Sequence, residues 1–226
     1  MQADRGVIKV LKNKSCALFD LDGTLVDTSI DLGRATAFVL EQYGIAPKWT
    51  DNDYRRFVGN GAKKLLERAF EYKLNDNELE RALELFKAKY NEILTDNAYI
   101  YEGMKEALAY LKNNGFSLAV VTNKPHTSAV IMVEKLFGKG YFDCIVGALE
   151  DKPKKPDPYA SKLAISMLNK SACDAVFFGD SDVDVLTARN TGIPCVACSW
   201  GFRSYESLLS ASPEVIIENP NQIINL

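Results

Sequence analysis

The sequence lacks the features that mark membrane proteins, nucleic-acid-binding proteins and secreted proteins. No apolar run approaches the roughly 20 residues of a membrane span, and 27 lysines and arginines are outnumbered by 30 aspartates and glutamates. The resulting net charge of -3 leaves no basic footprint for nucleic acid. Residues 1–14 mix charges with apolar residues and have no small-residue cleavage site, so we expect no signal peptide and a cytoplasmic protein.

Cysteine provides neither a disulfide framework nor a zinc site. The five cysteines make an odd number and show no framework spacing. Cys195 and Cys198 form a nominal C-x-x-C pair, but no second pair exists to complete a zinc site. They lie in a short apolar run, where a strand would point positions i and i+3 to opposite faces. We therefore interpret both as small core residues.

The sequence does contain an apolar run that ends in two carboxylates. Ala17-Leu18-Phe19 precedes Asp20-Leu21-Asp22-Gly23, a pattern typical of a buried parallel strand that ends in a functional loop. Two like charges this close resist joint ionisation unless a cation compensates. With a divalent metal beside them, one carboxylate can attack an electrophile while the other moves a proton. The pattern therefore indicates a catalytic site.

Two kinds of periodicity divide the chain of 226 residues. Helical spacing recurs over residues 29–43, 61–73 and 77–94, with no convincing strand between them. From residue 101 onward, strand and helix patterns alternate. Strands are predicted near residues 117–121, 142–146, 175–178, 194–197 and 215–217, and helices near 104–114, 127–137, 159–168 and 183–191.

Alternation of this kind implies a parallel sheet that is covered on both faces by helices. We therefore predict an α/β fold with a Rossmann-like parallel-sheet core and a small all-helical cap inserted after the first strand. The core would comprise residues 1–26 and 97–226, and the cap residues 27–96.

Four predicted strand ends carry polar side chains directly after apolar runs. They are Asp20 with Asp22, Thr122 with Asn123, Lys155, and Asp180 with Ser181. Each alone has a structural explanation, such as a turn, a helix cap or a solvated loop charge. Because ligands of open α/β sheets bind outside the carboxyl ends of the strands, we expect the four groups to form one site.

This set of side chains fits phosphoryl transfer, which needs positive charge and hydrogen-bond donors around the phosphate and an in-line nucleophile. Asp20, Asp180 and the backbone carbonyl of Asp22 would offer Mg²⁺ the hard oxygens that it prefers. Asp184, on a helix that starts there, would support metal-bound water. The predicted phosphate ligands, besides loop N–H groups, are Thr122, Asn123 and Lys155.

The same residues resemble the four motifs of the haloacid dehalogenase-like phosphohydrolases. The motifs, in the family's order along essentially the whole chain, are Asp20-Leu21-Asp22-Gly23-Thr24, Thr122-Asn123, Lys155-Pro156 and Gly179-Asp180-Ser181 with Asp184. The resemblance implies that Asp20 is the nucleophile and becomes an aspartyl phosphate. It also implies that Asp22 protonates the leaving alcohol and then activates water, and that Asp20, Asp22 and Asp180 are the Mg²⁺ ligands.

Three details narrow the class within that family. An aspartate at position 22 favours phosphate over halide chemistry. The only histidine, His126, follows the Thr122 segment and lies outside the predicted cap, which argues against a sugar-phosphate mutase; we expect it in a loop or at a helix start. Lys154 competes with Lys155 for the role of phosphate lysine, and we favour Lys155 because it directly precedes Pro156.

The predicted cap is similar to the phosphoglycolate phosphatase branch of the family. The similarity lies in Phe57-Val58-Gly59-Asn60-Gly61-Ala62, in Leu65-Leu66-Glu67-Arg68-Ala69 and, downstream, in Trp200-Gly201-Phe202. Gly59, Asn60 and Gly61 form either a turn that approaches the substrate closely or an ordinary linker between helices. The flanking cations either attract a substrate carboxylate or are simply solvated; they are Arg55, Arg56, Lys63 and Lys64.

From these features we expect a Mg²⁺-dependent phosphomonoesterase that acts on a small phosphorylated metabolite, with 2-phosphoglycolate the first candidate. Pyrophosphate, a nucleoside monophosphate or a sugar phosphate would use the same site. A regulatory or binding protein with the same fold and no turnover is the alternative from another class. Both a monomer and a homodimer remain open, and the expected partner is the small-molecule phosphate.

Overall fold

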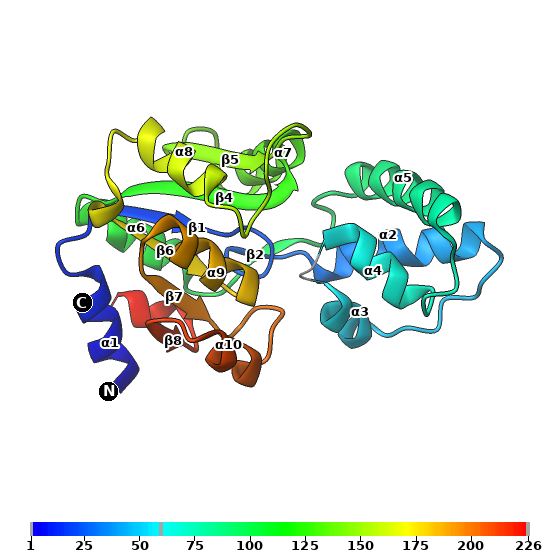
Figure 1. The fold of residues 1–226 in the computed structure, drawn as a ribbon, viewed down its shortest axis with the longest axis horizontal. Helices are drawn as coiled ribbons and strands as arrows, with labels where there is room; N and C mark the ends of the chain where they lie inside the picture. Colours follow the sequence, from blue (N-terminus) through cyan, green and yellow to red (C-terminus); the bar gives the residue numbers. More distant parts are fainter. Residues whose placement is uncertain (1, 59–60, 225–226) are drawn as a thin grey trace. The chain divides into compact units, whose positions relative to one another are not determined.

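The computed structural model describes residues 2–58 and 61–224. Its internal contacts divide the chain into two compact units, one of Met1–Val26 with Ile100–Leu226 and one of Asp27–Tyr99. Figure 1 shows the helices and strands of both units. Within the described part of the chain, no helix has both the length and the apolar character needed to cross a membrane.

The larger unit is built on a six-stranded sheet. Its strands are β1 (Cys16–Phe19), β4 (Ser117–Pro125), β5 (Cys144–Ala148), β6 (Ala175–Gly179), β7 (Cys195–Cys198) and β8 (Val215–Ile217). They lie in the order β5-β4-β1-β6-β7-β8, and each neighbouring pair is parallel. The predicted α/β fold with a parallel sheet and a helical insert after the first strand is therefore confirmed.

Helices connect the strands of this sheet. They are α6 (Met104–Asn113), α7 (His126–Phe137), α8 (Tyr159–Met167), α9 (Asp182–Thr191) and α10 (Tyr205–Ala211). Two short 3₁₀ helices, η1 (Ala172–Asp174) and η2 (Pro220–Ile223), complete the unit together with an N-terminal helix, α1 (Gln2–Leu11). The sequence patterns did not predict α1 or α10, because each carries its few buried apolar residues among charged or polar ones.

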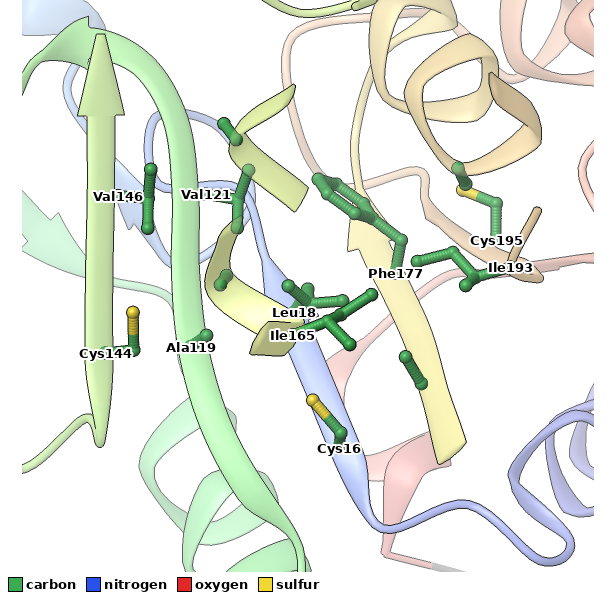
Figure 2. Packing of buried hydrophobic residues seen from close by; sticks show 14 of the residues in the cluster. Cys16, Leu18, Ala119, Val121, Cys144, Val146, Ile165, Phe177, Ile193 and Cys195 are labelled. Carbon is green, nitrogen blue, oxygen red and sulfur yellow. The ribbon is translucent and has the colours of Figure 1, made fainter. Parts of the chain in front are cut away.

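Alternate strand residues form the core on one face of the sheet (Figure 2). Leu18 of β1, Val121 of β4 and Phe177 of β6 point to this face, where Ile165 of α8 packs against them. α9 contributes to the same cluster, whereas α6 and α7 contact β4 and cover the opposite face. Because both faces are covered, the strands are apolar throughout and only their ends carry polar side chains.

Cys195 and Cys198, at the two ends of β7, are buried and unpaired. Burial raises the pKa of both thiols well above the ordinary value, which makes them inert. The interpretation of the pair as core residues agrees with this placement.

The smaller unit is helical. Its helices are α2 (Ser29–Gln42), α3 (Asp51–Phe57), α4 (Gly61–Ala69) and α5 (Asp76–Glu92). Two short strands, β2 (Val26–Asp27) and β3 (Tyr99–Ile100), pair where the chain passes between the units. α5 begins at a capping box, in which Asn75 and Glu78 each accept a hydrogen bond from the other's backbone N–H.

Several elements of the structure differ from the predicted ones. The helix predicted over residues 61–73 ends at Ala69, because Glu71 and Tyr72 have positive φ angles of 54° and 59°. α3 was not predicted, since only Tyr54 of its seven residues is buried. β5 starts two residues later than predicted, where Cys144 pairs with Ala119.

Candidate active site

The loop after β1 carries the first two aspartates of the site. The backbone N–H of Asp20 still bonds the Phe178 carbonyl at 2.9 Å, so β6 fixes its position. The chain then turns at Gly23, which has a φ of +91°. A Cβ at Gly23 would lie 2.4 Å from an oxygen of Asp180, so only glycine allows the turn to pass this close to the carboxylate.

Asp180 follows β6 directly and is held by two donors. Thr24 Oγ1 donates to its Oδ1 at 3.1 Å, and the Phe202 N–H donates to its Oδ2 at 2.7 Å. The Phe202 segment can approach because Gly201 has no side chain; a Cβ there would lie 2.2 Å from Asp180 Cβ. The carboxylate is therefore oriented by loops that follow β1 and β7.

Asp184 enters the site from the first turn of α9. Ser181 caps this helix by accepting the Asp184 N–H, and the Asp184 carboxylate accepts the Ser181 N–H and hydroxyl in return. One carboxylate oxygen from each of Asp20, Asp180 and Asp184 lies within 4.8 Å of the others. Among the described residues, this is a cluster of hard oxygen donors whose spacing could hold a metal ion.

Lys155 is the cation of this cluster. Its Nζ lies 2.8 Å from Asp20 Oδ1 and 2.7 Å from Asp184 Oδ1, and its side chain is 3% exposed. Asn123 fixes the backbone of Lys155 from both sides, accepting its N–H at 2.8 Å and donating to its carbonyl at 3.0 Å. Lys154, by contrast, is exposed, so the structure places the preferred one of the two predicted lysines in the site.

A second buried lysine, which the sequence patterns did not identify, contacts Asp22. Lys124 Nζ lies 3.0 Å from Asp22 Oδ1 and 3.3 Å from Asp22 Oδ2. Strand β4 continues through Pro125, so Thr122 and Lys124 occupy alternate positions and are both buried. Continuing the alternation past residue 121 would have predicted an inward lysine at this position.

The electrostatics indicate that the cluster lacks positive charge. Burial raises the pKa of Asp20 to about 7, although Lys155 acts to lower it. Burial, and then the nearby charges of Asp184 and Asp20, raise the pKa of Asp180 well above its usual range. Burial alone would lower the pKa of Lys155, but Asp184 and Asp20 outweigh it and raise that pKa above the ordinary value. A divalent cation would satisfy this unmet negative charge.

The remaining predicted residues lie in the smaller unit or at helix starts. Gly59 and Asn60 lie outside the described residues, and Gly61 begins α4. Arg55 forms an ion pair with Asp27 at 2.7 Å. His126 is the first residue of α7, as expected, and its Nδ1 accepts the Gly147 N–H at 3.3 Å. The other predicted cap cations are exposed; they are Arg56, Lys63 and Lys64.

Comparison with known proteins identifies related chains. The family model described as haloacid dehalogenase-like hydrolase matches residues 17–198. A phosphoglycolate phosphatase of Pseudomonas fluorescens is 36% identical over 212 residues, covering 92% of this chain and 77% of the relative. A phosphoglycolate phosphatase of Colwellia psychrerythraea is 33% identical over 223 residues, covering 95% of this chain and 97% of the relative.

The chain is also similar in structure to solved proteins of the same family. A crystal structure from Lactobacillus delbrueckii subsp. bulgaricus, provisionally assigned as a phosphoglycolate phosphatase, has a TM-score of 0.88 at 30% identity and covers 93% of this chain and 96% of its own. A haloacid dehalogenase-like family protein from Streptococcus pneumoniae has a TM-score of 0.83 at 27% identity, with coverages of 94% and 98%. The similarity therefore extends over both units of the chain.

Proposed function

The chain belongs to the haloacid dehalogenase-like hydrolase family, and from this premise we propose that it is a Mg²⁺-dependent phosphomonoesterase of small phosphorylated metabolites. The observation that carries the proposal is the buried cluster of Asp20, Asp180 and Asp184 around the Lys155 ammonium. Three chain segments, which follow β1, β5 and β6, supply these groups and Asp22 at one edge of the sheet, which is where open α/β sheets bind their ligands.

The donor set fits Mg²⁺. Asp20 and Asp180 would hold the ion together with the backbone carbonyl of Asp22, and Asp184 would hold its water. When bound, Mg²⁺ would supply the positive charge that neutralises the phosphate oxygens during transfer. The raised pKa of Asp20 and of Asp180 supports this assignment, because a cation at the cluster would favour the ionised carboxylates.

The chain's own residues would carry out the transfer in two steps. An oxygen of Asp20 attacks phosphorus, the bond from phosphorus to the substrate oxygen breaks, and Asp22 gives its proton to the leaving alkoxide. Asp22 then takes a proton from water as that water attacks the aspartyl phosphate. Inorganic phosphate leaves, and the Asp20 carboxylate is restored.

Lys155 and Thr122 would hold the phosphate oxygens. Both are buried at the site, and Lys155 already orients one oxygen of Asp20. Asn123 remains a predicted phosphate ligand. Its side-chain amide also bonds the Lys155 backbone and so helps to position the Lys155 ammonium. A fixed ammonium stabilises charge on the transferring group without reorganisation.

We propose 2-phosphoglycolate as the first candidate substrate. Support comes from the names of the relatives at 33–36% identity and from the Gly59-Asn60-Gly61 segment, which remains a predicted substrate loop. The cap of such an enzyme selects the substrate and excludes water, so related phosphatases can differ in specificity while sharing the core site.

A substrate panel at fixed Mg²⁺ tests the proposal. It should contain 2-phosphoglycolate, a sugar phosphate, a nucleoside monophosphate, pyrophosphate and 4-nitrophenyl phosphate. We expect the highest kcat/KM for 2-phosphoglycolate. A preference for another member of the panel would change the proposed substrate but leave the proposed phosphatase activity in place. Undetectable turnover across the panel would favour a non-catalytic binding protein.

A further inference from the structure

Two buried lysines contact different aspartates of this site. Lys155 contacts Asp20 and Asp184, whereas Lys124 contacts both oxygens of Asp22, at 3.0 and 3.3 Å. Each lysine side chain is only 3% exposed. Burying an ammonium group costs free energy unless it is paired with a negative charge. Each lysine therefore needs the carboxylates that it contacts.

The backbone aims Lys124 at this position. The pairing of β4 with β5 shifts register between Val121 and Pro125, and such irregularities re-aim side chains at sheet edges next to active sites. Within the shifted segment, the Lys124 N–H donates to Thr122 Oγ1 at 3.2 Å. Lys124 therefore approaches Asp22 from a local structure built into the end of β4.

Contact with both oxygens restricts the rotation of the Asp22 carboxylate. The Asp22 side chain is more exposed than that of Asp20, with exposed fractions of 21% and 13%. A partly exposed aspartate in a loop would otherwise be free to change rotamer. The ion pair thus holds Asp22 in one direction without removing it from reach of a substrate.

We infer that Lys124 is a positioning residue for Asp22, and that its contribution to hydrolysis increases with the basicity of the leaving group. The inference rests on the proposed function, in which Asp22 gives its proton to the departing alkoxide. An alkyl oxygen needs that proton, whereas 4-nitrophenolate departs readily without one. Lys155, which contacts the nucleophile, should instead contribute equally for every leaving group.

The experiment compares Lys124→Met with Lys155→Met on three substrates: 4-nitrophenyl phosphate, ethyl phosphate and 2-phosphoglycolate. The readout is kcat/KM, which reports the steps up to cleavage and excludes the hydrolysis step common to all three. Misplacing a catalytic group costs about 100-fold, so Lys124→Met should lose about 100-fold more on ethyl phosphate than on 4-nitrophenyl phosphate. Lys155→Met should lose the same factor on both.

Controls separate positioning from folding and from substrate recognition. Lys139→Met, at an exposed position, should leave all three rates unchanged, and Lys124→Arg should restore part of the ethyl phosphate rate. Because Lys124 acts through Asp22, adding Lys124→Met to Asp22→Asn should cost less than about twofold more on ethyl phosphate, as expected for coupled residues. Both proteins in this comparison carry Asp22→Asn, so the loss of activity that this substitution causes is common to them and does not affect the ratio of their rates.

Each alternative result has a definite meaning. Equal losses by Lys124→Met on aryl and alkyl phosphates, or full additivity with Asp22→Asn, would overturn the inference while leaving the phosphatase in place. A loss confined to 2-phosphoglycolate would also overturn it, because Lys124 would then recognise the substrate carboxylate. Absence of turnover by the wild-type protein would overturn the proposed function and this inference together.

Discussion

Replacing Lys155 by Met should destabilise the larger unit strongly when metal ions are absent. The substitution keeps most of the side-chain volume and removes the ammonium that pairs with Asp20 and Asp184. The Asp184 side chain is 0% exposed, so water cannot replace the lost partner. Removing one member of a buried ion pair costs about 3–5 kcal/mol, and we expect a decrease of that size in the free energy of unfolding at pH 8.

The loss should depend on pH, with a sign that follows from Asp20. Burial raises the pKa of Asp20 to about 7 even with Lys155 present, and the substitution removes the charge that lowers it. A carboxyl whose pKa is higher in the folded than in the unfolded protein holds more protons when folded, so stability decreases as pH rises above the unfolded value near 4. The difference between Lys155→Met and wild type should therefore be smaller at pH 5 than at pH 8.

Urea unfolding in excess chelator measures this effect. A Trp49→Phe background leaves Trp200, which lies in the larger unit and donates to the Thr24 carbonyl at 3.0 Å, as the remaining tryptophan probe. Lys154→Met is the matched control: the neighbouring lysine is exposed, so its loss should change stability by less than about 0.5 kcal/mol. Equal stabilities of the two variants at pH 8 would refute the electrostatic account of the cluster.

Three further predictions follow from the site and its surroundings. Gly201→Ala should force the Phe202 loop away from Asp180, because the new Cβ would lie 2.2 Å from Asp180 Cβ; overpacking of this kind costs about 1–3 kcal/mol, and an unchanged thermal midpoint would contradict it. Asp27 is buried, and although burial itself acts to raise its pKa, hydrogen bonds from Ser29 and the charge of Arg55 lower the pKa below the usual value. The contribution of Asp27 to stability is therefore present above pH 4 and lost as pH falls further. In a plot of urea midpoint against pH, Asp27→Asn should show a smaller decrease below pH 4 than wild type does; equal decreases for the two proteins would argue against this. Chelation should abolish hydrolysis, with recovery on addition of Mg²⁺ but poor recovery with Ca²⁺, which prefers more ligands and longer bonds; full activity in excess chelator would show that no metal takes part.

The sheet and the residues at its edge could be predicted because short stretches of sequence indicate them. Apolar runs that end in Asp20 and Asp180 identify buried parallel strands, and the carboxyl ends of such strands meet at one edge whatever the connecting loops do. The assignment of Lys155 over Lys154 followed from its neighbour Pro156. The chemical roles of these residues remain predictions.

Other features of the site and of the fold depend on where strands end and on tertiary contacts, which the apolar patterns alone did not indicate. Lys124 was missed because the apolar run ends at Val121, whereas the strand continues to Pro125 through a register shift set by β5. The donors to Asp180 come from Thr24 and Phe202, which lie far from it in sequence. Helix α3 buries only Tyr54, too little to produce a helical pattern.

The most direct test of the central claim is the hydrolysis of 4-nitrophenyl phosphate by Asp20→Asn in the presence of Mg²⁺. The amide is nearly the same size as the carboxylate but is a poor nucleophile, so we expect a folded protein, checked by circular dichroism, without measurable turnover. Turnover by Asp20→Asn at the wild-type rate would contradict the claim that Asp20 attacks the phosphate.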